Sequence, residues 1–175
     1  MNQKKITSPI DNETKSSLHS GNMVLLSGII YTARDAAHKR LVELIEKGES
    51  LPFELAGATI YYAGPSPAPP GKITGAIGPT TSGRMDIYTP TMIKAGLIAM
   101  IGKGKRSAEV STACQEYGAL YFAAVGGAAA LLAKTVVNVE VIAWPELEAE
   151  AIRRLEVRDM PLVVINDIYG NELYR

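Results

Sequence analysis

The run Val24-Leu25-Leu26-Ser27-Gly28-Ile29-Ile30-Tyr31 is followed at once by Thr32-Ala33-Arg34-Asp35. The run itself is mostly apolar, which predicts a largely buried strand. The four residues after it have the form of a capping box in which Asp replaces Glu. Apolar residues then recur at helical spacing before Gly48, which is typical of a helix end: Ala33, Ala37, Leu41, Leu44 and Ile45. We therefore expect a helix over residues 33–47 directly after the strand.

The same alternation of strand and helix continues along the chain. The patterns predict further strands over residues 58–63, 73–77, 97–101, 119–125, 136–143 and 161–166. They predict helices over residues 89–96 and 107–117, one that follows Gly126-Gly127 and runs through Ala133, and one beginning at Pro145. Residues 1–20 are a polar, extended lead-in with a short helix, and the proline-rich segment 64–71 is a stiff loop. The sequence thus predicts a single α/β domain over residues 1–175, with a mixed sheet flanked by helices.

Composition and charge exclude several classes of protein. The chain has 175 residues and a mass of 18.7 kDa, and 47% of its residues are hydrophobic, which suits one globular domain. Lys+Arg and Asp+Glu each total 18, so the positive surplus usual in nucleic-acid binders is absent. No apolar run approaches the roughly 18 residues of a membrane span, and the first residues lack a hydrophobic signal region. We expect neither a nucleic acid nor a membrane as a partner.

Cys114 is the only cysteine of the chain. It cannot form an internal disulfide, so the expected compartment is the reducing cytoplasm. One thiol cannot hold a four-cysteine zinc site or an iron–sulfur cluster alone, so we expect no metal site within the chain. Its neighbours follow a helical pattern, which favours a core thiol over a nucleophile.

Three segments place polar groups where a predicted strand ends, which is where functional groups gather in α/β proteins. In the first segment, Arg34 and His38 are four residues apart and share a helix face. The alternative is a solvated face on which Asp35 pairs with Lys39. In the last segment, Gly102-Lys103-Gly104-Lys105 directs a lysine from a strand end at an anion. It lacks the glycine spacing and the Ser or Thr of a nucleotide-binding loop.

The middle segment, Gly78-Pro79-Thr80-Thr81-Ser82-Gly83-Arg84, offers three hydroxyls and a guanidinium. Backbone amides, hydroxyls and an arginine fork all donate to a carboxylate, so such a loop suits an anion. The alternative is a turn whose hydroxyls satisfy their own backbone. Together, two arginines and one lysine from the three segments would hold a small dicarboxylate.

Longer motifs run through these segments. They are Ser27-Gly28 with Tyr31-Thr32-Ala33-Arg34-Asp35-Ala36-Ala37-His38-Lys39-Arg40-Leu41, then Gly78-Pro79-Thr80-Thr81-Ser82-Gly83-Arg84-Met85-Asp86, then Ile101-Gly102-Lys103-Gly104. In sequence and order they resemble the motifs of the C-terminal domain of class I fumarate hydratases. The resemblance covers nearly the whole chain, from Ser8-Pro9-Ile10 to Asn171. Such domains have a swivelling β/β/α fold, which the resemblance implies here.

The resemblance also implies a cofactor and a partner. The family consists of iron–sulfur-dependent hydro-lyases, and in its two-subunit members the α chain supplies three cysteines to a four-iron, four-sulfur cluster. A β chain of about this size completes the site. We therefore expect this chain to be the β subunit, the cluster to be held by its α subunit and the assembly to be an α2β2 heterotetramer.

Residue roles are carried over from the same resemblance, for the reversible hydration of fumarate to malate. Dicarboxylate binding is expected of three basic residues and a neighbouring hydroxyl: Arg34, Arg84, Lys103 and Thr81. Thr80 matches the threonine that removes the proton next to a carboxylate, and His38 is a second catalytic candidate. A free threonine is a weak base, so its surroundings must assist it. Asp86 is expected to orient Arg84 or the loop rather than to touch substrate.

Two other interpretations stay open at this point. The β subunit of L-tartrate dehydratase has similar motifs, although four residues here resemble the fumarase form more: Ala33, Ala37, Gly83 and Asp86. A non-catalytic module that binds carboxylates or assembles with a partner would use the same basic loops without the chemistry.

Overall fold

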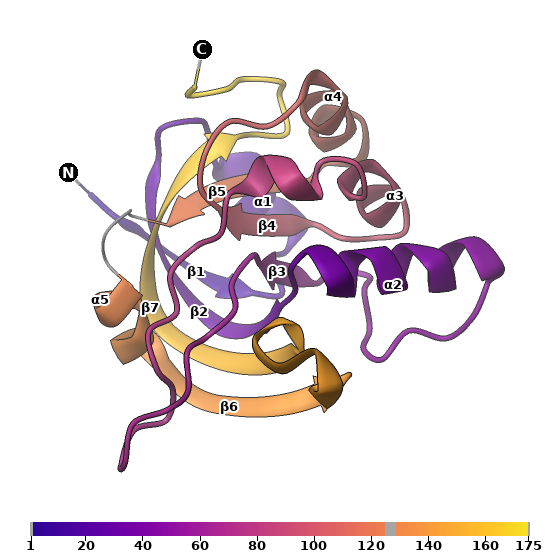
Figure 1. Cartoon of the computed structure of the whole chain (residues 1–175). Helices are drawn as coiled ribbons and strands as arrows, with labels where there is room; N and C mark the ends of the chain where they lie inside the picture. The colour runs from indigo at the N-terminus through magenta and orange to yellow at the C-terminus, as the bar shows by residue number, and fades with distance from the viewer. Residues whose placement is uncertain (1, 125–128, 175) are drawn as a thin grey trace.

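The computed structural model describes residues 2–124 and 129–174 and contains a strongly curved mixed sheet with helices on its outside (Figure 1). The strands are β1 (Lys4–Ser8), β2 (Met23–Thr32), β3 (Thr59–Tyr61), β4 (Ala99–Gly102), β5 (Leu120–Ala124), β6 (Val136–Ala143) and β7 (Ile152–Asn166). The α-helices are α1 (Asn12–Ser17), α2 (Asp35–Lys47), α3 (Thr89–Lys94), α4 (Ala108–Tyr117) and α5 (Ala129–Thr135). Two 3₁₀ turns are η1 (Ser82–Met85) and η2 (Pro145–Glu150). The predicted α/β class with a mixed sheet is confirmed.

The sheet closes on itself through its longest strand. Its order is β1-β2-β3-β4-β5-β7-β6, and β2 pairs with β7 as well. The pairs from β1 through β5 are parallel, whereas β7 runs antiparallel to β2, β5 and β6. As a result, the carboxyl ends of β2, β3 and β4 lie at the same end of the molecule.

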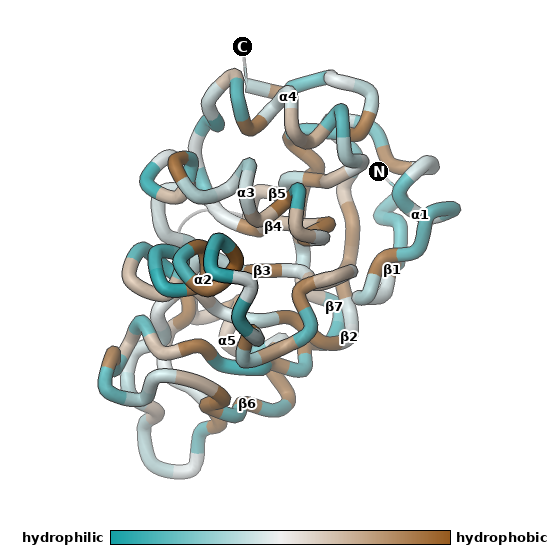
Figure 2. Tube along the Cα trace, turned by 90° about the vertical axis from the view of Figure 1, so that its right-hand side faces the viewer, coloured by the Kyte–Doolittle hydropathy of each residue, from teal (hydrophilic) through white to brown (hydrophobic). Residues whose placement is uncertain are grey.

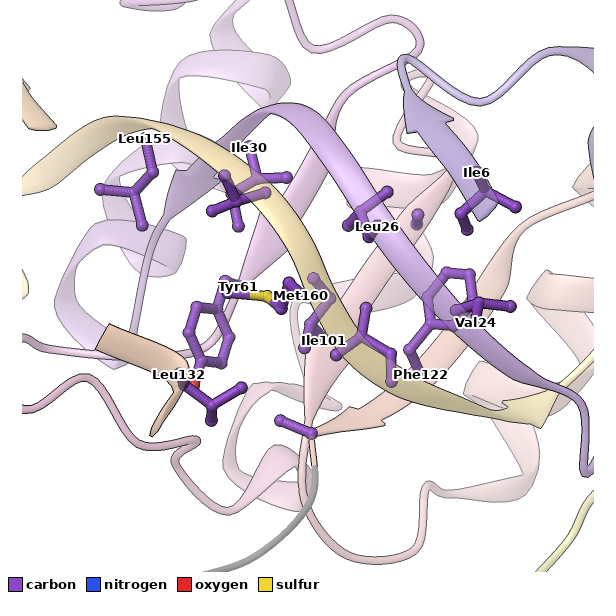
Figure 3. Close-up of a cluster of buried hydrophobic side chains, with 14 of the residues drawn as sticks. Ile6, Val24, Leu26, Ile30, Tyr61, Ile101, Phe122, Leu132, Leu155 and Met160 are labelled. Atoms are coloured by element: carbon purple, nitrogen blue, oxygen red, sulfur yellow. The ribbon is translucent and has the colours of Figure 1, made fainter. Parts of the chain in front are cut away.

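The inside of the closed sheet is one hydrophobic core. Residues along the central strands alternate between this core and the outer face, as the two-residue period of a strand requires. Tyr61, for example, faces inward, while its neighbours Ile60 and Tyr62 face outward. Figure 3 shows side chains from six strands and α5 gathering in this core: Ile6, Val24, Leu26, Ile30, Tyr61, Ile101, Phe122, Leu132, Leu155 and Met160.

A second core lies between the outer face of the sheet and helices α2, α3 and α4. These helices lie on the same side of β3 and β4 (Figure 1), and Figure 2 shows hydrophilic and hydrophobic residues alternating along α2. Each helix contributes buried side chains to this core: Ala37 and Leu41 of α2, Met92 and Ile93 of α3, Val110 and Cys114 of α4. The central strands are thus buried on both faces, which explains their nearly continuous apolar runs. The prediction that Cys114 is a core thiol is confirmed.

Three strand predictions were wrong or incomplete. The strand β1 lies in the polar lead-in, where only two of its residues are buried. Residues 73–77 form no strand, because the proline-rich arm folds back and its Ser66 N–H donates to the Ala76 carbonyl oxygen at 3.0 Å. Strand β7 begins at Ile152, well before the predicted start at residue 161. Its first half carries charged residues on the exposed face, so the sequence there lacks the continuous apolar run from which a strand was predicted.

The start of α2 also differs from the prediction. Its N-cap is Arg34, which makes no side-chain capping hydrogen bond, so the expected capping box does not form. The hydroxyl of Thr32 instead accepts from the backbone N–H of Arg153 at 3.2 Å. The N–H of Ala36 donates to Oε1 of Glu150 at 3.2 Å. A carboxylate from η2, far along the chain, therefore caps α2, with the charge sign that a helix N-terminus favours.

Other predicted boundaries agree closely with the structure. The predicted strand 136–143 is β6, and Ser107 caps α4 by accepting from the Val110 N–H at 3.3 Å. The helix predicted from Pro145 is the 3₁₀ turn η2. The start of the helix predicted after Gly126-Gly127 lies outside the described part of the chain, and α5 covers the remainder.

Within residues 2–124 and 129–174, no helix combines the length and apolar character needed to cross a membrane.

Candidate active site

The three sequence motifs meet at the carboxyl ends of β2, β3 and β4. These strands are parallel neighbours, with Thr32 beside Tyr61 and Tyr61 beside Ile101 in the register. Arg34 follows β2 and Lys103 follows β4 immediately. Because the carboxyl ends of parallel strands share one edge, residues from distant parts of the chain lie close together here.

The loop of the second motif lies between the ends of β3 and β4. The backbone N–H of Thr80 donates to the Tyr62 carbonyl oxygen at 2.7 Å. Thr81 forms a parallel bridge with Lys103, and the Ser82 N–H donates to the Lys103 carbonyl oxygen at 2.9 Å. The predicted site residues Thr80, Thr81 and Lys103 are therefore neighbours, held by backbone hydrogen bonds.

Arg34 and Arg84 approach the same carboxylate. Nε of Arg84 lies 3.2 Å from Oδ1 of Asp35, and Nε of Arg34 lies 3.8 Å from Oδ2 of the same side chain. The Arg84 side chain is 52% exposed and that of Arg34 is 26% exposed. The structure thus brings the two predicted arginines together from α2 and η1, on a surface open to solvent. The alternative pairing of Asp35 with Lys39 does not occur.

His38 lies one turn along α2 and is completely buried, between the rings of Tyr62 and Tyr88. Burial lowers the pKa of His38 to about 4, so its ring is neutral at pH 7. Its Nδ1 lies 2.9 Å from the Arg34 carbonyl oxygen, which assigns the proton to Nδ1 because a carbonyl only accepts. His38 is therefore beneath the exposed basic residues, bonded to the backbone of Arg34.

Arg106 is a buried cation that sequence reasoning missed. Its Nε donates to Oδ1 of Asp86 at 2.7 Å, and its Nη2 donates to the hydroxyls of Thr89 at 2.9 Å and Tyr62 at 3.2 Å. Burial opposes the charge of Arg106, but the neighbouring Tyr62 and Asp86 outweigh it and raise its pKa. Among the described residues, Arg106 thus links the end of the second motif to β3 and α3. The only sequence signal was an arginine just before the helix-capping Ser107.

Of the two roles expected for Asp86, the structure supports the orientation of the loop and not that of Arg84. Asp86 does not contact Arg84: one of its carboxylate oxygens pairs with Arg106, and the other accepts from the Ser107 N–H at 2.6 Å. The carboxylate points toward the start of α4 because the buried guanidinium and the helix N-terminus both attract it. Asp86 consequently anchors the loop, while Asp35 is the acidic residue that contacts Arg84.

A second polar link ties the loops of the second and third motifs. The Tyr121 hydroxyl donates to the Gly104 carbonyl oxygen at 2.8 Å and lies 2.8 Å from the Ser82 hydroxyl, which donates to it. Gly102 is required at this point, because an added Cβ would lie 1.9 Å from Ser82 Oγ. The loop of the second motif therefore sits directly against the end of β4.

The described residues contain no group of three or more His, Cys, Asp or Glu side chains that could hold a metal ion. Cys114 is buried within α4 in the second core, and burial raises the pKa of its thiol to about 12. The side chains of this chain therefore do not offer the thiolate ligands that an iron–sulfur cluster needs.

Comparison with known proteins identifies the family. A family model described as the fumarase C-terminus matches residues 2–175. The chain belongs to the fumarase C-terminus family. This confirms the resemblance inferred from the three motifs, and it agrees with their convergence at one edge of the sheet.

Relatives of this fumarase C-terminal domain fall into two groups by length. It is 41% identical over 156 residues to fumarate hydratase 2 of Leishmania major and 42% identical over 152 residues to the anaerobic class I fumarate hydratase of Escherichia coli. The matches cover 88% and 86% of this chain but only 28% of each relative. It is also 41% identical over 163 residues to a putative L(+)-tartrate dehydratase subunit beta of Methanocaldococcus jannaschii, covering 90% of this chain and 84% of that protein. The domain is thus related to hydratases and dehydratases, and it spans about a quarter of the fumarate hydratases it matches.

Proposed function

We propose that this chain is the β subunit of a two-subunit iron–sulfur hydro-lyase that interconverts fumarate and L-malate. One observation carries the proposal: Arg34, Arg84 and Lys103 lie with the hydroxyl loop of Thr80 and Thr81 at one edge of the sheet. In this proposal the chain provides the groups that bind the dicarboxylate and move its proton.

The basic residues suit a small dianion. An arginine fork binds a carboxylate through two parallel N–H donors, and a lysine adds a third positive charge. Arg84 is half exposed, so a substrate carboxylate can reach it. As malate loses its C3 proton, negative charge develops on the adjacent carboxylate. Cations that hold this charge more tightly in the transition state accelerate the reaction.

Thr80 is assigned the transfer of the C3 proton. Its backbone is fixed by the hydrogen bond to Tyr62, so its side chain is presented from an anchored loop. In the dehydration direction, the deprotonated Thr80 oxygen takes the C3 proton, the C3–H electron pair forms the double bond and the C2–O bond breaks. The departing hydroxide and the proton released from Thr80 together form the product water. His38 is neutral and buried, so its assigned contribution is to hold the Arg34 backbone rather than to touch substrate.

The cofactor and the partner are proposed from the resemblance to two-subunit members of the family. Without a cluster of metal-ligating side chains here, a four-iron, four-sulfur cluster would be held by the α subunit and would supply Lewis-acid chemistry at the substrate hydroxyl. The relative from M. jannaschii is named a subunit beta and is matched over most of its length. On this basis we propose an α2β2 heterotetramer in the cytoplasm.

L-tartrate is the second candidate substrate. It is favoured by the identity of 41% to the putative tartrate dehydratase subunit, which equals the identity to the fumarate hydratase of L. major. L-malate and L-tartrate are both four-carbon dicarboxylates. On dehydration, each loses a hydroxyl group and a proton from the neighbouring carbon. The same arginines and lysine would therefore bind either of them.

An anaerobic hydratase assay tests the proposal. Fumarate absorbance is followed with this chain alone, with a cluster-loaded α partner alone and with the two mixed. Activity only in the mixture supports a β subunit that completes a shared site. Activity of this chain alone overturns the assignment of the cluster to the partner. Activity of the mixture with tartrate, but not with fumarate or malate, supports the second candidate. If the mixture turns over none of the three compounds, the result supports a non-catalytic module that binds carboxylates.

A further inference from the structure

Buried polar atoms without a hydrogen-bond partner are concentrated in one turn of the described structure. Three such side-chain atoms are found, namely Nε of Arg34, Oδ2 of Asp35 and Nε2 of His38. All three belong to the N-cap residue or the first turn of α2. Buried polar groups normally find partners, so an unsatisfied cluster indicates a functional constraint. Arg34 and His38 already have roles in the proposed function, whereas Asp35 has none.

Asp35 lies between two arginines that come from different elements. Its carboxylate is 3.2 Å from Nε of Arg84 and 3.8 Å from Nε of Arg34. Each arginine therefore faces Asp35 with the Nε corner of its guanidinium. Both contacts are made through Nε, so the Nη atoms of the two arginines are not engaged by Asp35. Those Nη atoms form the outer edge of the fork, which is the edge that binds carboxylates bidentately.

The surroundings of Asp35 restrict both arginines. Asp35 is the first residue of α2, and the next N–H is bonded to Glu150 at 3.2 Å, so the helix start is fixed. The Arg34 side chain passes Gly64 so closely that an added Cβ there would lie 3.2 Å from Nη1. Arg84 belongs to η1, whose neighbouring residues Ser82 and Met85 are buried. The carboxylate thus joins two anchored segments at their exposed arginines.

We propose that Asp35 is a positioning residue that holds Arg34 and Arg84 as one clamp for the two carboxylates of the substrate. This inference rests on the proposed function, because the clamp binds the same dicarboxylate. Asp35 neutralises one of the three site cations, so Arg34, Arg84 and Lys103 together with it carry a net charge of two positive, which matches a dianion. Guanidinium groups that are already held in place lose little conformational entropy when the substrate binds, which favours affinity.

Two simpler roles for Asp35 make different predictions. An acidic residue in the first turn stabilises a helix through the macrodipole. Such a role changes stability and leaves substrate binding alone. Alternatively, Asp35 only screens the positive charge of the site. Removing its charge would then strengthen the binding of an anion and lower KM.

The test is Asp35→Asn in the assembled enzyme, with Glu109→Gln as the matched control. Glu109 is the acid in the first turn of α4 and forms no ion pair among the described residues, so it shares only the dipole effect. The clamp predicts that Asp35→Asn raises KM roughly ten-fold despite the added positive charge, with a smaller change in kcat, because misaligned binding groups lose affinity. Glu109→Gln keeps KM unchanged. A lower KM, or an unchanged KM, for Asp35→Asn overturns the clamp.

A second measurement separates this inference from the proposed function. In the full chain labelled with ¹⁵N, relaxation of the arginine Nε–Hε signals reports how ordered each guanidinium is, and Arg34→Lys and Arg84→Lys assign the two signals. The clamp predicts that both are ordered in the natural chain and mobile in Asp35→Asn. If the assembled natural enzyme does not turn over fumarate or malate, the proposed function fails, and this measurement still decides the clamp. If the two guanidinium groups are equally ordered in the natural chain and in Asp35→Asn, the clamp is overturned.

Discussion

Nε of Arg106 and Oδ1 of Asp86 form a buried ion pair 2.7 Å long, in which the arginine side chain is fully enclosed. The pair joins the end of the second motif to the residue just before Ser107, the N-cap of α4. Because the other oxygen of Asp86 accepts from the start of α4, the loop that carries Thr80 and Arg84 is attached to the helix layer. The position of the candidate site residues on this loop thus depends on a buried ion pair.

Arg106→Met is expected to destabilise the chain by about 3 kcal/mol, because it leaves the Asp86 carboxylate in a largely buried position without its cation. Urea unfolding measures the difference. The matched control is Arg40→Met, since the 39% exposed Arg40 pairs with Glu146 on the surface and such pairs contribute about 0–1 kcal/mol. Equal losses in the two variants would contradict the anchoring role of Arg106.

Gly102→Ala is expected to displace the loop of the second motif and to reduce the turnover of the assembled enzyme at least ten-fold. The new Cβ would meet Ser82 Oγ at 1.9 Å and Tyr62 Cδ2 at 2.9 Å. Thermal unfolding and kinetics are measured together. Gly83→Ala serves as the control for stability, because an added Cβ there has no atom within 4 Å. An unchanged melting temperature and rate for Gly102→Ala would show that the close packing is unimportant.

Arg84→Ala is expected to lower kcat/KM of the assembled enzyme by about three orders of magnitude without loss of folding, because it removes a half-exposed cation that holds growing charge. Circular dichroism checks the fold, and the anaerobic assay gives the rate. Arg158→Ala, at an exposed arginine of β7, should keep full activity. Near-normal turnover of Arg84→Ala would remove this arginine from the site.

His38 should make the folded chain less stable in weak acid. Its pKa is about 4 when folded and about 6.5 when unfolded, because burial disfavours the charged ring. Between these values the unfolded state binds more protons, so stability falls as the pH decreases from about 6.5 to about 4, by up to about 3 kcal/mol. Urea unfolding at a series of pH values tests this. His38→Asn should show a weaker pH dependence over this range, and an identical dependence would contradict the assignment to His38.

The Cys114 thiol should resist modification in the native chain. It is buried, and burial raises its pKa to about 12, so almost no thiolate is present near pH 8. A colorimetric disulfide reagent measures the reaction. In native buffer the reaction should be at least a hundred-fold slower than in urea, where one equivalent reacts. Rapid reaction in native buffer would show that the second core opens readily.

Local patterns predicted much of the fold because they depend on period and capping alone. The boundaries of β6 and the Ser107 cap of α4 follow from neighbouring residues, and so does the buried run of β2. The first half of β7 was missed, because its charged residues are stabilised by pairing with β2 and β6 rather than by an apolar run. The capping box was wrong because Thr32 and Glu150 meet partners from distant segments.

By itself, the sequence determined the α/β class, the family and the three segments that carry the candidate site, since each rests on contiguous residues. Only the tertiary structure decided which side chains meet. The pairing of Asp35 with Arg84, and of Asp86 with Arg106 rather than Arg84, depends on loops that parallel strands bring to one edge. The neutrality of His38 likewise depends on burial beneath Tyr62 and Tyr88, because desolvation is a property of the packed core and not of the local sequence.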